Sequence, residues 1–264
     1  MKLQYRMEDV KIPNFRHDGK VAIVTGGTSG IGYAIALTYA NYGADVVVAA
    51  RTAEDCERVA KEIESLGVRG MGIPTNVNDP AQVKNLVDTT VAKFGKLDIM
   101  VCGSGIGSSS KSLDTTPEAF DKVIDIDLKG VFLCANAAAE QMIAQGNGGR
   151  IIPISSMAAF SGSIGLTAYC AAKAGVVGMI RAQAVEWARY NITINALCPG
   201  YVATSINADA FQNQKVLDGI VKNAPLRRLG TMEEMAAGAL YLASDFAGYT
   251  TGTTLLMDGG TNAW

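Results

Sequence analysis

One stretch decides the fold of this chain, VAIVTGGTSGIG at residues 21–32. It opens with a β-branched run, passes through a turn rich in glycine and leads into a helical pattern that continues through Ile35 and Leu37. A strand that feeds such a turn into a helix places backbone N–H groups and the positive helix end where a pyrophosphate can lie. The stretch therefore predicts the first βα unit of a dinucleotide-binding fold.

The same alternation of strand and helix continues outward along the chain. Residues 46–48 form another continuous apolar run, which is typical of a strand buried on both faces, and Val59, Ile63 and Leu66 then recur at helical spacing. Seven strands are predicted, over residues 21–24, 46–48, 70–75, 97–101, 150–154, 193–197 and 253–257. The series predicts an α/β fold of the doubly wound Rossmann type, a seven-stranded parallel sheet with helices on both faces. Pro153 falls inside one of these strands, where a proline removes a donor from the ladder.

Length and composition fit one domain. The 264 residues are 48% hydrophobic and 18% charged, enough apolar material for a large core, and no repeat or composition break divides them. We expect an N-terminal extension over residues 1–19 and one dinucleotide-binding and catalytic domain over residues 20–264. Residues 201–225 lack a clear pattern, which predicts a substrate loop, a helix that the pattern does not reveal, or both.

Charge and cysteine content narrow the partners. Lys and Arg number 23 against 25 Asp and Glu, which argues against nucleic acid and anionic membranes as partners. Five cysteines without C-x-x-C spacing predict reduced thiols and no zinc site. A charged N-terminal segment without a long apolar run predicts a cytoplasmic protein with no membrane span. His17, the sole histidine, excludes a Ser-His-Asp triad and a His-based metal site, and we expect it on the surface.

The end of the second strand predicts which dinucleotide binds. About twenty residues past the glycines, NAD-binding proteins carry an acid that bonds the ribose 2′-OH. Ala50 and Arg51 stand there instead. A guanidinium pairs bidentately with a 2′-phosphate, so the sequence favours NADP(H). The alternative is that Arg51 merely begins a solvated helix, since Glu54 and Asp55 follow closely.

Tyr169 and Lys173 predict the chemistry. They lie four residues apart, and this spacing brings them to one face of a helix. A nearby ammonium lowers the pKa of a phenol from about 10, as a general acid/base for an alcohol–ketone pair requires. Ser155 and Ser156, at the end of the fifth predicted strand, offer hydroxyls that hold a carbonyl oxygen.

Together these motifs resemble the short-chain dehydrogenase/reductase family over nearly all of residues 19–260. Residues 25–32 are similar to its TGxxxGIG motif, Tyr169 and Lys173 to its YxxxK motif, and Ser156 to its catalytic serine. Pro199-Gly200 with Thr204 resembles its PG motif and nicotinamide-side threonine, and residues 258–260 its DGG.

The resemblance implies hydride transfer between a nicotinamide and a carbonyl carbon. In it Tyr169 passes the proton, Lys173 holds the ribose and lowers the tyrosine pKa, and Ser156, rather than Ser155, orients the substrate oxygen. It also implies a homotetramer. The expected cofactor-binding residues are Gly26, Thr28, Ser29, Gly30, Ile31, Gly32, Arg51, Thr52, Asn76, Val77, Gly103, Tyr169, Lys173, Pro199, Gly200, Val202 and Thr204.

Three positions depart from the family pattern. Residues 102–105 read CGSG where the family has Asn-Asn-Ala-Gly, and Asn76 replaces an Asp that meets the adenine, where an amide makes similar hydrogen bonds. Asp127 replaces an Asn that anchors a water between Lys173 and solvent. We include Asp127 among the catalytic candidates: either its carboxylate holds that water, or it pairs with Lys173 and weakens the pull of the lysine on Tyr169.

The leading hypothesis is an oxidoreductase that transfers a hydride between NADP(H) and a ketone or secondary alcohol. Both chain ends resemble family members that act on keto sugars, polyols and sugar acids, such as gluconate 5-dehydrogenases. One alternative is a 3-oxoacyl thioester reductase, which prefers a basic patch that only Arg227-Arg228 suggests. A second is a dinucleotide-binding sensor without turnover, although Ser156, Tyr169 and Lys173 are all retained.

Overall fold

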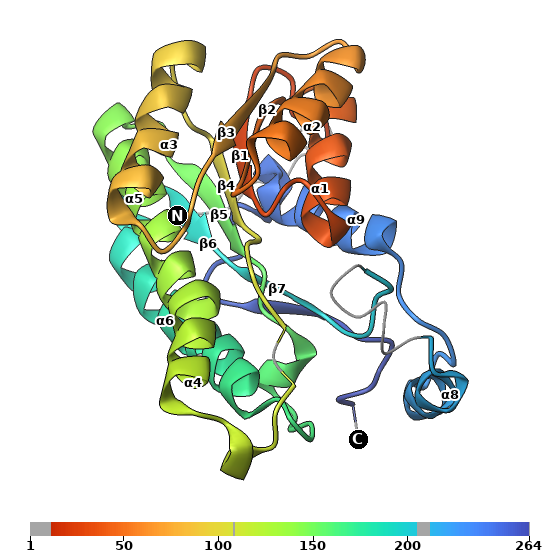
Figure 1. Ribbon diagram of the computed structural model, residues 1–264. Coiled ribbons are helices and arrows are strands. Elements are labelled where there is room, and N and C mark those ends of the chain that lie inside the picture. Colours follow the sequence, from red (N-terminus) through yellow and green to blue (C-terminus); the bar gives the residue numbers. More distant parts are fainter. Residues whose placement is uncertain (1–11, 108, 205–211, 264) are drawn as a thin grey trace, which may run out of the picture.

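A computed structural model describes residues 12–107, 109–204 and 212–263. Six strands form a parallel sheet in the order β3-β2-β1-β4-β5-β6 (Figure 1). The strands are β1 (Val21–Thr25), β2 (Asp45–Ala50), β3 (Gly70–Pro74), β4 (Ile99–Cys102), β5 (Gly149–Pro153) and β6 (Ile192–Ile194). The chain moves outward from β1 to β3 and then returns past β1 to β4. The switch point of a doubly wound sheet therefore lies between β1 and β4, and the predicted fold class is confirmed.

Helices cover both faces of the sheet (Figure 1). The cluster of buried side chains on one face joins the sheet to α1 (Gly30–Asn41), α2 (Ala53–Ser65) and α9 (Met232–Ala243). The opposite cluster joins it to α3 (Pro80–Phe94), α5 (Gly130–Gln145) and α6 (Thr167–Trp187). Every residue of β1 is buried, as the continuous apolar run predicted. Two shorter helices, α4 (Pro117–Ile124) and α8 (Gln214–Asn223), lie toward the carboxyl edge of the sheet (Figure 1).

The prediction of one strand over residues 193–197 is wrong, because two strands lie there. The predicted seven-stranded sheet is therefore a six-stranded sheet and a separate two-stranded one. β6 ends at Ile194, and β7 (Ala196–Pro199) pairs with β8 (Thr254–Met257) in a separate two-stranded sheet. One bridge, between Ile154 and Leu197, connects the two sheets. The break falls at Asn195, whose side chain donates to the Thr250 carbonyl at 2.7 Å and accepts from the Thr253 N–H at 3.2 Å. These side-chain bonds hold the backbone where the ladder is interrupted.

The same break accounts for Pro153. The N–H groups of Gly149 and Ser155 donate to Asn191 and Leu197, on the β6–β7 side of β5. Backbone N–H groups alternate sides along a strand, so the nitrogen of Pro153 faces that side too, between these two bonds. The proline therefore removes a donor at the point where β6 has ended and β7 begins.

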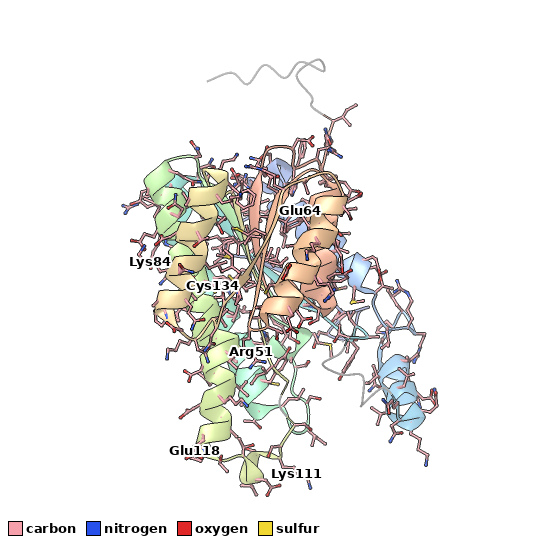
Figure 2. All side chains as sticks on the ribbon, turned by 45° about the horizontal axis from the view of Figure 1, so that its top comes forward. Arg51, Glu64, Lys84, Lys111, Glu118 and Cys134 are labelled. Carbon is pink, nitrogen blue, oxygen red and sulfur yellow. The ribbon has the colours of Figure 1, made fainter. Side chains whose placement is uncertain are left out.

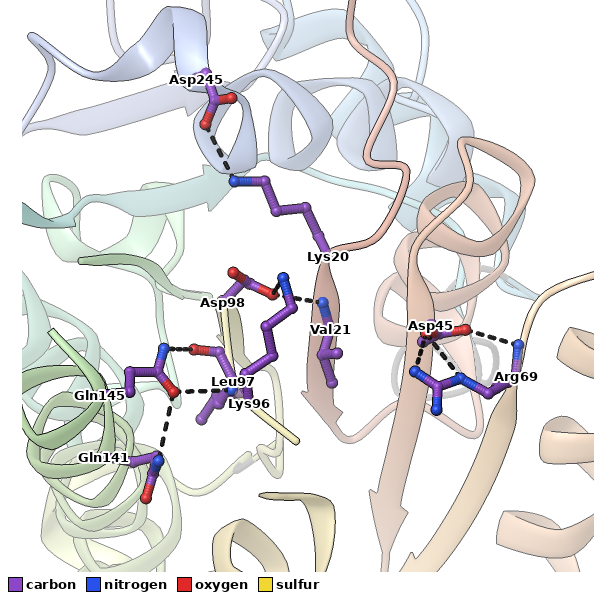
Figure 3. A network of polar contacts seen from close by, with 10 residues as sticks. All are labelled: Lys20, Val21, Asp45, Arg69, Lys96, Leu97, Asp98, Gln141, Gln145 and Asp245. Carbon is purple, nitrogen blue, oxygen red and sulfur yellow. Dashed lines mark hydrogen bonds and ion pairs between the residues drawn. The ribbon is translucent and has the colours of Figure 1, made fainter. Parts of the chain in front are cut away.

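Polar contacts join neighbouring segments at the amino ends of the strands (Figure 3). Asp98 accepts from the Val21 N–H at 2.8 Å and pairs with Lys96 at 3.0 Å. Gln145, from α5, accepts from the Leu97 N–H at 3.1 Å and donates to the Leu97 carbonyl at 2.6 Å. Backbone groups that the ladder leaves unpaired are satisfied here.

His17 is buried, contrary to the expected surface position. Its side chain is 2% exposed and its ring lies 5.5 Å from the ring of Tyr39, whose hydroxyl donates to the Ala239 carbonyl. His17 Nε2 is buried without a hydrogen-bond partner among the described residues. Burial lowers the pKa of His17, because a buried charge loses its hydration.

This burial predicts a pH dependence of stability. In the unfolded chain His17 binds a proton below about pH 6.5, whereas in the folded state it stays neutral to lower pH. The free energy of unfolding therefore decreases as the pH falls below about 6.5. We expect the free energy of unfolding to fall between pH 7.5 and 5.5 by ~1 kcal/mol more in the wild type than in a His17→Phe variant. Urea unfolding at both pH values measures this difference, and equal losses would contradict a neutral buried histidine.

Candidate active site

A pocket of about 510 Å³ opens at the carboxyl ends of the strands, beside the switch point. Its walls come from the loops that follow β1, β2, β3, β4, β5 and β7, together with α4 and α6. Every residue named from the sequence as catalytic or cofactor-binding lines it. They are Gly26, Thr28, Ser29, Gly30, Ile31, Gly32, Arg51, Thr52, Asn76, Val77, Gly103, Asp127, Ser156, Tyr169, Lys173, Pro199, Gly200, Val202 and Thr204.

The glycine loop after β1 is shaped for close backbone approach. Gly26 and Gly30 have φ of 67° and 55°, which L side chains rarely adopt. A Cβ on Gly32 would lie 2.3 Å from the Gly26 carbonyl oxygen, and one on Gly26 would lie 2.6 Å from that of Gly103. Ser29, the N-cap of α1, makes no side-chain capping bond. The first N–H groups of α1 thus line a concave surface that fits a pyrophosphate.

Thr25 joins this loop to the one after β4. Its buried hydroxyl donates to the Val101 carbonyl and accepts from the N–H groups of Gly103 and Ser104, at 3.1 and 3.4 Å. Cys102, where the family has Asn, is buried in the core. The departure in residues 102–105 therefore leaves the backbone of Gly103 facing the pocket.

Arg51 lies close to α2 (Figure 2) and lines the pocket together with the loops after β1 and β2. Helix α2 begins at Ala53 with Thr52 as its N-cap, so Arg51 precedes the helix and lines the pocket. Arg58, on α2, donates to the Thr28 carbonyl at 3.2 Å. This hydrogen bond joins the glycine loop to α2.

Six further lining residues were missed from the sequence: Thr75, Asn78, Ile106, Lys122, Ile126 and Ile154. Helical spacing offered a signal for two of them. Lys122 and Ile126 lie eight and four residues before Gly130, where a Cβ would approach Val77 Cγ2 to 2.8 Å. Asn78 Oδ1 is buried without a hydrogen-bond partner among the described residues, a feature that no sequence pattern reveals.

The catalytic candidates meet between β5 and α6. Lys173 Nζ lies 5.4 Å from the ring centroid of Tyr169 and donates to the Ile154 carbonyl at 3.0 Å. Ser155 is buried and donates to the Lys173 carbonyl at 2.9 Å, which fastens α6 to the end of β5. Ser156 accepts from the Ala158 N–H, so its hydroxyl proton is left for a substrate oxygen. The geometry thus favours Ser156 over Ser155.

Asp127 forms a buried ion pair with Lys173. It lies in η3 (Asp125–Lys129), a π-helical turn between α4 and α5, and is 0% exposed. Asp127 Oδ2 is 3.1 Å from Lys173 Nζ, and Oδ1 accepts from the Ile106 N–H at 2.9 Å. Since Oδ2 has no partner with hydrogen-bond geometry among the described residues, the contact is chiefly electrostatic. Asp127 and Lys173 thus lie within ion-pair distance of each other.

The pair keeps Lys173 charged. Burial alone would lower the pKa of Lys173, but the neighbouring Tyr169 and Asp127 raise it, and the net pKa is above the ordinary lysine value. Cys198 of β7 also faces the lysine, and burial raises the pKa of its thiol to about 11. The lysine is therefore an ammonium, and the cysteine a neutral thiol, throughout the neutral range.

The described part of the chain holds no group of three His, Cys, Asp or Glu side chains that could bind a metal ion. None of the helices over residues 12–107, 109–204 and 212–263 is long and apolar enough to cross a membrane.

The chain is similar to known dehydrogenases and reductases over most of its length. A family model described as Enoyl-(Acyl carrier protein) reductase matches residues 26–262. L-rhamnose 1-dehydrogenase (NAD(P)(+)) of Sphingomonas sp. (strain SKA58) is 36% identical, over 92% of this chain and 96% of its own. The 3-oxoacyl-[acyl-carrier-protein] reductase FabG of Thermotoga maritima is 37% identical, over 93% of this chain and 98% of its own.

A solved structure matches over nearly the whole chain. The gluconate 5-dehydrogenase from Burkholderia cenocepacia J2315 in complex with NADP and tartrate is 32% identical, with a TM-score of 0.91 over 95% of this chain and 98% of that one. Such coverage extends the likeness from single motifs to the whole architecture. The chain belongs to the short-chain dehydrogenase/reductase family.

Proposed function

We propose that this protein is an NADP(H)-dependent dehydrogenase that interconverts a secondary alcohol and its ketone on a sugar, polyol or sugar acid. One observation carries the proposal: Ser156, Tyr169 and Lys173 line the same pocket as the glycine loop. The relatives named for L-rhamnose and gluconate support the substrate class.

Each catalytic residue has one task. Bound NADP(H) supplies the hydride in reduction and accepts it in oxidation. In reduction the Tyr169 hydroxyl gives its proton to the carbonyl oxygen while the carbonyl carbon receives the hydride, so the product is a neutral alcohol. The Lys173 ammonium stabilises the tyrosinate left behind, and the Ser156 hydroxyl holds the substrate oxygen in line.

NADP(H) is the proposed cofactor because Arg51 borders the pocket where an adenosine 2′-phosphate would lie. A guanidinium binds phosphate bidentately, and Ala50 leaves no carboxylate there to repel it. The related gluconate 5-dehydrogenase crystallised with NADP supports this assignment.

A 3-oxoacyl thioester reductase is the second candidate, because the FabG relative carries that name and the description of the family model also names an acyl carrier protein. An acidic carrier protein needs a basic patch on its partner. Arg228 already makes two hydrogen bonds with Glu234, at 2.9 and 2.6 Å, which weakens the only basic pair that the sequence offers. A dinucleotide sensor without turnover ranks third, since the three catalytic side chains meet in one pocket.

Replacing Tyr169 tests the proton transfer. We expect Tyr169→Phe to lower kcat by about 10²–10⁴-fold, since general acid–base catalysis contributes that much, while NADPH binding stays near wild type. Absorbance at 340 nm follows turnover, and nucleotide fluorescence gives the dissociation constant. Tyr249→Phe, on a fully exposed side chain, serves as the control. A variant that keeps a tenth of the wild-type rate would remove Tyr169 from this role.

The adenosine end is tested by exchanging two residues. The double variant Ala50→Asp, Arg51→Ser should lower kcat/KM for NADPH by about 10–100-fold, because a charge-assisted pair is lost and a carboxylate repels the phosphate. Its kcat/KM for NADH should rise. Arg69→Ser, at the other end of the sheet, should change neither value. An unchanged NADPH preference in the double variant would mean that other groups hold the 2′-phosphate.

We also propose a cytoplasmic homotetramer. All five cysteines are free thiols, as a reducing compartment requires. Helix α6 carries an exposed apolar row, and α5 exposes two further apolar side chains, a surface suited to helix pairing between copies. These residues are Ala171, Ala174, Gly178, Ala182 and Val185 on α6, with Phe132 and Ile143 on α5.

Light scattering on the purified protein tests the assembly. We expect a mass four times the 27.7 kDa of one chain. Val185, at the end of the α6 row, is 82% exposed, and Val185→Glu places a charge there that should shift the mass toward smaller species. A wild-type monomer at micromolar concentration would refute the homotetramer.

A further inference from the structure

Positive charge is unevenly distributed along the pocket. Among the described lining residues the cations are Arg51, Lys122 and Lys173. Arg51 belongs to the adenosine end, and Lys122 lies on α4. Lys173 is the cation beside the catalytic tyrosine, with its Nζ 5.4 Å from the Tyr169 ring centroid.

The charge of Lys173 is already matched. Asp127 Oδ2 lies 3.1 Å from its ammonium, and both side chains are at least 95% buried. Lys173 also donates to the Ile154 carbonyl, which occupies one of its three N–H bonds. An anion that approached the lysine would meet the carboxylate of Asp127 almost as closely, so the pair attracts anions far less than a lone ammonium would.

The segments around the catalytic residues add no positive charge. Among the described residues, 102–107, 154–172, 196–204 and 257–263 contain no Lys, Arg or His. Their acidic residue is Asp258, which accepts from the N–H of Gly260 at 2.9 Å and that of Asn262 at 2.8 Å. A Cβ on Gly200 would lie 2.5 Å from Asp258 Cα, so this C-terminal turn packs directly behind the pocket wall.

Hydroxyl and backbone groups are available instead. Ser104 and Ser156 line the pocket, and both carry hydroxyls that donate and accept. Such groups can make the hydrogen bonds that the hydroxyls of a neutral sugar lose when they leave water. A carboxylate that leaves water needs a charged partner, and without one its transfer is costly.

We infer that the substrate is an uncharged polyhydroxy compound, a neutral sugar or polyol, and that Asp127 excludes carboxylate substrates by neutralising Lys173. This inference rests on the proposed function and narrows its substrate class. Asp127 thereby becomes a specificity-determining residue, acting on the substrate through Lys173.

The test compares substrates that differ in charge. Ethyl acetoacetate and acetoacetate share a ketone and differ mainly in the ester or carboxylate beside it, and L-rhamnose and D-gluconate extend the comparison to sugars. Reduction with NADPH and oxidation with NADP⁺ are followed at 340 nm. We expect kcat/KM to be at least about tenfold higher for the uncharged member of each pair, a factor that corresponds to ~1.4 kcal/mol.

Two matched variants isolate the carboxylate of Asp127. Asp127→Asn leaves the Lys173 ammonium uncompensated and should narrow the ester-to-acid ratio by about tenfold or more. Asp125→Asn removes the same charge from the same π-helical turn, where Asp125 pairs with the exposed Lys129 at 3.3 Å, and should leave the ratio unchanged. Because both substrates meet the same enzyme, a general loss of activity does not alter the ratio.

Three results would overturn the inference. A wild-type enzyme that uses acetoacetate or gluconate as well as the uncharged partner contradicts it. An Asp127→Asn ratio equal to that of Asp125→Asn removes Asp127 from specificity. If Asp127→Asn does not fold, the salt dependence of the wild-type enzyme is measured instead. A steep fall of kcat/KM for the carboxylate substrate between about 0.01 and 0.5 M salt would reveal a cation that attracts it, and would overturn the inference. Absence of turnover on every compound, with NADPH still bound, is a different result that refutes the proposed function.

Discussion

The ammonium group of Lys173 contacts three structural elements that surround the pocket. It donates to the Ile154 carbonyl just past β5, faces Asp127 in the π-helical turn and lies beside the ring of Tyr169 on its own helix. An unpaired ammonium buried this deeply would be costly, so the three partners must be present together. The positions of β5, η3 and α6 around the pocket are therefore coupled.

The π-helical turn makes this arrangement possible. The extra residue in such a turn rotates the helix and places side chains where a regular helix would not, and such turns are frequent at functional sites. Small residues make room around it. A Cβ on Gly105 would lie 3.0 Å from Asp127 Oδ2, and one on Gly175 would lie 2.8 Å from Leu128 Cδ2. Gly105 thus leaves room for the carboxylate of Asp127, and Gly175, two residues after Lys173, leaves room for the neighbouring Leu128 side chain.

The two ends of the pocket use different physics. At the phosphate end, N–H groups from the glycine loop and the start of α1 supply partial positive charge, and Arg51 adds a full one. At the catalytic end, a buried ion pair, hydroxyls and a phenol act in surroundings without net charge. A doubly wound sheet permits this division because its switch point lets two sets of loops diverge, one after β1 and β2 and the other after β4, β5 and β7.

The sequence by itself determined the features that depend on short spacing. The strand–turn–helix over residues 21–32 and the pair Tyr169 and Lys173 are local patterns whose geometry follows from the backbone, and the alternation of strands and helices predicted the doubly wound sheet. The structure brought every residue named from these motifs into one pocket. Residues 1–11, 108, 205–211 and 264, including part of the predicted substrate loop, lie outside the described residues.

Only the tertiary structure decided what depends on distant contacts. The break at Asn195 needs residues 250–253, and the burial of His17 needs Tyr39. The ion pair of Asp127 needs Lys173, a residue 46 positions away. The sequence gives the chemical type of each side chain, but the packing of helices and strands sets its partner. A buried charge is removed from water, so it can interact only with the groups that the fold places next to it.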